Sequence, residues 1–197
     1  MRSGYPGTDT GGRISEVNRT LGAEGRRVPV EFQAVPAGRA VEIVRAWALH
    51  RWPMTVDEGV EVYTGLGFTA PTEDRTFFTS DMSPQEADSF FLTKGDHVRK
   101  VSLRLSNWVP EEERERSLPD SRAAFDEYAR AYTGVLGEPF SSEDEGTEFS
   151  RRWILDTKVM VMLIGNEAFI DLYIDSPENT GLFLWEREME ERGEPLD

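Results

Sequence analysis

The chain has 197 residues and no cysteine, and this absence removes a whole class of chemistry. Without thiols there is no disulfide framework, no thiolate metal site and no cysteine nucleophile. Long apolar runs are also missing: the longest, Val159 to Gly165, is far below the roughly 20 residues that cross a bilayer. The first 27 residues lack the apolar core of a secretory signal. These absences predict a cytoplasmic protein that does not bind membranes.

Basic residues are few and unevenly placed. The chain has 37 acidic residues against 22 basic ones, for a net charge of −15. Residues 1–51 carry a net charge of +3 and residues 52–197 carry −18. Nucleic-acid binding depends on lysine and arginine side chains that neutralise phosphates, so the acidic balance argues against such a ligand. The charge favours a basic partner protein, or serves solubility alone.

Hydrophobic residues make up 38% of the chain and aromatic residues 11%, enough for a folded core. We expect a flexible N-terminal tail over residues 1–27, a single α+β domain over residues 28–192, and a short tail over residues 193–197. Within the domain, apolar side chains at three- and four-residue spacing predict helices over residues 37–52, 55–67 and 121–137 and after Pro177. The order Ser83, Pro84, Glu86 is typical of a helix start and predicts another helix that ends by Gly95.

Strands are indicated where the apolar period changes to two. Alternating side chains predict strands over residues 28–35, 97–106, 148–155, 159–164 and 168–175. The fold class is therefore α+β, with an antiparallel sheet packed by helices on one side. Residues 63–68 and 132–137 share a Tyr-Thr-Gly beginning, which suggests two related halves, 53–108 and 120–176. The alternative is that glycine after a helix is simply a favoured stop.

Three side chains share one face of the last predicted strand: Asp171, Tyr173 and Asp175. The two carboxylates are about 13 Å apart by strand rise, too far to hold one ion or share one proton. If this strand lies beside residues 97–106, both acids face Lys100 and Arg104, which is a structural arrangement.

Three tryptophans lie at element ends beside charged segments: Trp52, Trp108 and Trp185. Tryptophan and arginine dominate binding hot spots, so we take these residues, together with Asp171, Tyr173 and Asp175, as candidates for contact with a partner. The alternative for each ring is packing at the edge of the core.

Catalytic and cofactor motifs are absent. His50 and His97 have no ligand-spaced neighbours, no G-x-S-x-G elbow is present, and no phosphate-binding loop follows a strand. We therefore expect no cofactor and no enzymatic activity, and the leading function is protein binding. Two alternatives stay open: a small metal-dependent hydrolase that uses surface carboxylates, and an acidic mimic of nucleic acid.

Several segments together resemble an uncharacterised actinobacterial family of small acidic proteins. The resemblance covers roughly residues 45–180 and rests on Trp52 before a capped helix, Leu66-Gly67-Phe68, Leu105 to Trp108, Leu136 to Pro139, and Arg152-Trp153. The layout is also similar to secretion-chaperone-like and toxin-immunity proteins. Such proteins act by binding a partner, so the resemblance implies an immunity or chaperone-like role and carries over no catalytic residue.

Overall fold

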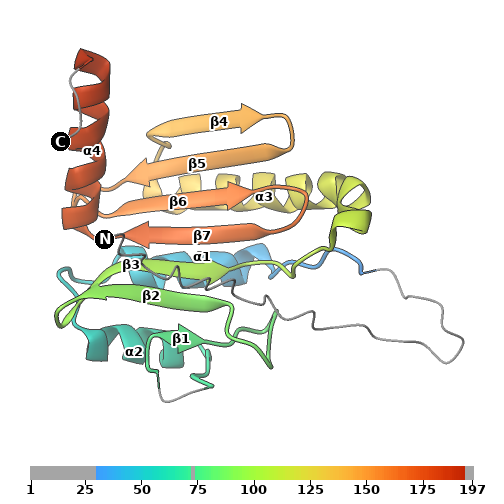
Figure 1. Cartoon of the computed structure of the whole chain (residues 1–197), viewed down its shortest axis with the longest axis horizontal. Coiled ribbons are helices and arrows are strands. Elements are labelled where there is room, and N and C mark those ends of the chain that lie inside the picture. The colour runs from blue at the N-terminus through green and yellow to red at the C-terminus, as the bar shows by residue number, and fades with distance from the viewer. Residues whose placement is uncertain (1–29, 72–73, 194–197) are drawn as a thin grey trace, which may run out of the picture.

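A computed structural model describes residues 30–71 and 74–193, which form one seven-stranded antiparallel sheet and four α-helices (Figure 1). The predicted α+β class with an antiparallel sheet is confirmed. The predicted tails, residues 1–27 and 193–197, lie outside the described residues except for Gly193, which caps the end of the last helix. No helix of the described part is both long and apolar enough to cross a membrane.

The elements follow one another in two similar runs. Their bounds are α1 (Ala37–Ala48), α2 (Val56–Gly65), β1 (Phe77–Phe78), β2 (Ser89–Lys94), β3 (His97–Arg104), a 3₁₀ turn (Glu111–Glu113), α3 (Arg114–Leu136), β4 (Ser141–Glu145), β5 (Glu148–Ile154), β6 (Met160–Gly165), β7 (Ile170–Asp175) and α4 (Pro177–Arg192). The strand order is β1-β2-β3-β7-β6-β5-β4. Each of α2 and α3 thus precedes a three-strand meander, and β7 joins the two meanders at the centre. The duplication stays a prediction.

The core lies between the sheet and the helices α1, α2 and α3. Alternate side chains of the three central strands are completely buried on this side, among them Leu103, Leu163 and Leu172. Tyr63 of α2 stacks on Phe78, with ring centroids 4.0 Å apart, and its hydroxyl donates to the backbone carbonyls of two neighbouring strands. Because this face of the sheet is covered, the opposite face is left for other contacts.

Local sequence explains the start of α2. Thr55 and Glu58 form a capping box, in which each side chain accepts a hydrogen bond from the other residue's backbone N–H. The helix ends at Gly65, and Gly67 follows with a φ of +85°, a conformation that glycine adopts without strain.

Two predictions were wrong. Residues 83–95 form no helix: the Ser83 hydroxyl donates to the Glu86 carbonyl in an irregular segment, and Ser89–Lys94 is β2. Buried Phe91 explains the outcome, because it fills the core only when the segment pairs with β3. Residues 28–35 form no strand within the described part, where Ala34 makes a single bridge to Ser106.

Candidate functional site

The face of the sheet opposite α1, α2 and α3, here called the open face, has a row of paired charges at its centre. In the register of β3 and β7, Lys100 lies opposite Asp175, and Arg104 lies opposite Asp171. Arg104 Nε is 2.9 Å from Asp171 Oδ1, and Lys100 Nζ is 3.9 Å from Asp175 Oδ2. The predicted pairing of opposite charges across the sheet is confirmed.

Burial changes the titration of this row. Asp171 is only 5% exposed, and its burial raises the pKa of the carboxyl group although the Arg104 guanidinium opposes the shift. The Tyr173 hydroxyl donates to Asp171 Oδ2 at 3.3 Å, and burial also raises the pKa of that phenol. Since each acid already has a basic partner, a protein that covers this row meets little unpaired charge.

An aromatic group lies at one end of the row. The Trp108 ring is 50% exposed and stacks on Phe169, with centroids 5.3 Å apart. The guanidinium groups of Arg104 and Arg114 each lie 5.5 Å from the centre of the Trp108 ring. Rings held between arginines in this way are rigid, amphipathic contact surfaces.

Apolar side chains lie on both sides of the charged row. Met162 and Ile164 of β6 project from the open face beside β7, because they lie opposite Tyr173 and Asp171 in the register. On the other side, Phe77 contacts Phe90 with centroids 5.7 Å apart, and Leu92 is 52% exposed.

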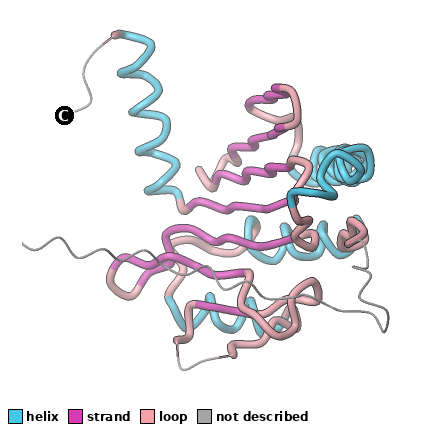
Figure 2. Tube along the Cα trace, turned by 45° about the vertical axis from the view of Figure 1, so that its right-hand side comes forward, coloured by secondary structure: helices cyan, strands magenta, loops and turns pink. Residues whose placement is uncertain are grey.

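Helix α4 crosses one end of the open face and then extends away from the body (Figure 2). Asn179 Nδ2 donates to Asp175 Oδ1 at 3.1 Å, and the Arg152 guanidinium lies 5.9 Å from the Phe183 ring. Arg187 lies 5.1 Å from the Phe140 ring. These three contacts come from positions four residues apart, which share one side of the helix, and in the first turn Glu178 also pairs with Lys94 and Arg99.

The structure brings most of the predicted residues together. Four of them share the open face: Asp171, Tyr173, Asp175 and Trp108. Trp185 lies on α4, the helix at one end of that face. Trp52 lies apart from them: it packs against the core beside α1, where its Nε1 donates to the Trp47 carbonyl at 3.3 Å.

Sequence reasoning missed several apolar residues of the open face, among them Phe77, Phe90, Leu92 and Met162. The first is in a two-residue strand that has no recognisable period, and the next two are in the segment predicted as a helix. The alternation of residues 159–164 did contain the signal for Met162, because its neighbours Val161 and Leu163 face the core.

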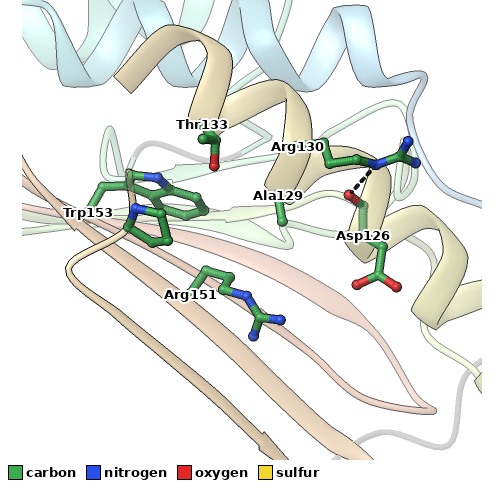
Figure 3. A pocket seen from close by; sticks show the side chains of 7 residues that line it. Asp126, Ala129, Arg130, Thr133, Arg151 and Trp153 are labelled. Atoms are coloured by element: carbon green, nitrogen blue, oxygen red, sulfur yellow. Dashed lines mark hydrogen bonds between the residues drawn. The ribbon is translucent and has the colours of Figure 1, made fainter. Parts of the chain in front are cut away.

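A cleft of about 570 Å³ lies on the other face, between α3 and β5 (Figure 3). It is lined by Asp126, Ala129, Arg130, Thr133, Pro139, Arg151 and Trp153. Most of the polar groups at the cleft take part in hydrogen bonds and ion pairs that stabilise the fold. Arg151 donates twice to Asp144 at 3.0 Å, and Arg122 bridges Asp144 to Asp126 at 3.2 Å from each. This network fastens the β4–β5 hairpin to α3, and the hydrogen bonds from Arg151 lower the pKa of Asp144.

No group of three or more histidine, aspartate or glutamate side chains within residues 30–71 and 74–193 is placed to hold a metal ion. The alternative of a metal-dependent hydrolase therefore has no supporting site in that part of the chain.

Residues 38–176 match the model of a family described as Family of unknown function (DUF6301). The chain belongs to this family. The prediction of an uncharacterised family is thereby confirmed. The DUF6301 match runs from the first turn of α1 through β7, so it includes the charged row and stops before α4. No curated protein and no solved structure matches the chain.

Proposed function

We propose that this DUF6301 protein is a non-enzymatic protein-binding module whose partner docks on the open face and α4. The distribution of exposed apolar side chains carries the proposal. Eight large apolar residues of the described part are well exposed, and six of them lie on the open face or on or beside α4: Phe77, Leu92, Trp108, Phe140, Leu182 and Trp185. A concentration of this kind is typical of a docking surface.

Charge supports a basic partner. The central acids of the open face are already paired, and Glu143 on β4 pairs with Arg152, but Glu145 on β4 and Glu186 on α4 are exposed and form no ion pair among the described residues. Together with the net charge of −15, they attract a basic protein and speed its association.

The role that fits best is a cytoplasmic immunity or chaperone-like protein of an actinobacterium, in which binding is itself the activity. The similarity in layout to such proteins and the lack of a catalytic motif in the sequence support this role. A nucleic-acid mimic is less well supported, because exposed acids also occur on the other side of the sheet, for example Asp57 and Glu61 on α2.

Two matched leucines test the docking surface. Leu92 on the open face is 52% exposed and Leu49 at the end of α1 is 55% exposed. We expect Leu92→Lys to abolish capture of the partner from a lysate of the source organism, whereas Leu49→Lys captures it as the wild type does. Quantitative mass spectrometry of captured proteins gives the readout, and thermal unfolding checks that both variants fold. Equal capture by both variants would overturn the proposal.

A further inference from the structure

Beyond its first turn, where Glu178 pairs with Lys94 and Arg99, helix α4 has a second side that the body of the protein does not contact. Asn179, Phe183 and Arg187 make the contacts with the body described above. Leu182, Trp185 and Met189 recur at intervals of three and four residues, so they form one stripe, here called the α4 stripe. At 3.6 residues per turn its centre lies about 130° around the helix from the side that contacts the body. Leu182 is 53% exposed and Trp185 is 47% exposed.

Some charged side chains of α4 form ion pairs and others do not. Arg187 pairs with Glu191 at 3.1 Å, Arg192 pairs with Glu188, and Glu178 pairs with Lys94 at 3.2 Å. Glu186 and Glu190 have no basic side chain at ion-pairing distance among the described residues. They are one turn apart, and at 100° per residue Glu186 lies about 70° and Glu190 about 110° around the helix from the centre of the stripe, both toward the side that contacts the body.

We propose that α4 binds a basic amphipathic helix of the partner. This proposal rests on the proposed function and specifies the chemistry of the part of the partner that α4 binds. The apolar residues of that helix cover the α4 stripe, and its lysine or arginine side chains reach Glu186 and Glu190. A helix is the natural occupant, because a straight apolar stripe of two turns is matched by residues at the same spacing on another helix.

Charge excludes a second copy as the preferred occupant. From Leu182 to Arg192, α4 has four glutamates against two arginines. Two such helices packed together would bring like charges close to Glu186 and Glu190, which costs binding energy. A basic helix gains from the same carboxylates.

Direct binding to the full-length protein tests the proposal. The probe is a fluorescent synthetic helix with leucines at the stripe spacing and lysines on the flanks, and the control peptide has glutamates in place of the lysines. We expect the lysine peptide to bind with a micromolar dissociation constant at low salt and the glutamate peptide not to bind. Trp185→Ala and the pair Glu186→Gln, Glu190→Gln should each weaken binding about tenfold, as measured by fluorescence anisotropy.

The matched control is the pair Glu188→Gln, Glu191→Gln, which removes the same charge from carboxylates already paired with arginines. It should change binding far less. Equal binding of the two peptides, or equal effects of the two pairs, would overturn the proposal. A dimer that forms with rising concentration and is lost in Trp185→Ala, seen by sedimentation, would also overturn it by assigning the stripe to a second copy.

The capture experiment with Leu92→Lys, repeated with the Glu186→Gln, Glu190→Gln pair, distinguishes this proposal from the proposed function. If Leu92→Lys loses the partner and the Glu186→Gln, Glu190→Gln pair keeps it fully, the open face docks the partner and the assignment of α4 is wrong. If neither change affects capture, both proposals fail.

Discussion

At the scale of single residues, one glycine determines how closely α3 approaches the sheet. Gly165 ends β6 on the core side, directly under the contact between Phe125 and Phe149, whose ring centroids are 4.6 Å apart. A Cβ atom at this position would lie 3.0 Å from Phe125 Cδ2 and would also overlap Phe149. The aromatic pair therefore packs well only above a residue that has no side chain.

Replacing Gly165 by alanine tests this packing. We expect Gly165→Ala to lower the free energy of unfolding by about 1–3 kcal/mol, because the rings must move out of their preferred positions. Gly134→Ala on α3 is the control, since its new Cβ would meet open space, and alanine favours a helix by about 0.5–1 kcal/mol over glycine. Urea denaturation measures both changes, and a loss of stability of the same size in both would contradict the interpretation.

Arg104 has a predicted effect that depends on pH. Burial already raises the pKa of Asp171, and removal of the guanidinium in Arg104→Gln should raise it further. At neutral pH the carboxylate is then ionised, buried and without its cation, which should cost about 3 kcal/mol of stability. Near pH 4, a larger fraction of this carboxyl group is protonated in the folded state than at neutral pH because its pKa is raised, so the variant should lose less stability there. Denaturation at the two pH values measures the difference, and an equal loss at both would refute this account.

At the scale of elements, the β4–β5 hairpin depends on its charge network with α3. The lowered pKa of Asp144 means that its ionised form stabilises the folded state above the ordinary value of 3.8, and that this contribution is lost as the pH falls through the lowered pKa. Asp144→Asn should therefore reduce stability at neutral pH by about 0.5 kcal/mol, since the carboxylate is well exposed, and should have little effect in acid.

Hydrogen exchange gives a local check of this network. The amides of β4 should exchange faster in Asp144→Asn than in the wild type, while those of β2 stay unchanged. Glu145→Gln is the matched control, because it removes an acid of the same strand that forms no ion pair in the described structure. Faster exchange of the β4 amides in both variants would mean that loss of any negative charge from this strand weakens it, and that the ion pairs of Asp144 are not the cause.

The sequence predicted those elements whose local signals agreed with their tertiary contacts. The capping box of Thr55 and Glu58, the two-residue period of β3 and the opposite charges of β3 and β7 all correspond to observed structure. The Ser83 motif failed because a start signal specifies only the first turn, and the following aromatic residues gain more by pairing as a strand. Strand β4 escaped notice because its side chains are exposed and polar, so no apolar alternation marks it.

Only part of the candidate site could be predicted from the sequence. Charges on one strand face were visible in the sequence, so Asp171, Tyr173 and Asp175 could be selected. The neighbours that turn this row into a surface come from strands adjacent only in the folded sheet, such as Leu92 and Met162. Trp52 had the same sequence signal as Trp108, and only the packing of the loop after α1 separates them.

At the scale of the whole molecule, stability should be shared between the two meanders through β7. Leu172 is fully buried and lies opposite both Leu103 and Leu163 in the register. We expect Leu172→Ala to cost about 2–5 kcal/mol and to lower the protection of β2 and β5 amides alike. Native-state hydrogen exchange measures both, and loss of protection in one meander alone would show that they unfold separately.

The central position of β7 also affects how the protein forms during synthesis. Residues 170–175 are the last strand to leave the ribosome, yet they pair with β3 on one side and β6 on the other. Until they emerge, β3 and β6 each have one edge without a partner, although every other strand is already available. The nascent chain must therefore keep two exposed strand edges from pairing with other chains, and a ribosome that stalls before residue 170 would release an aggregation-prone product.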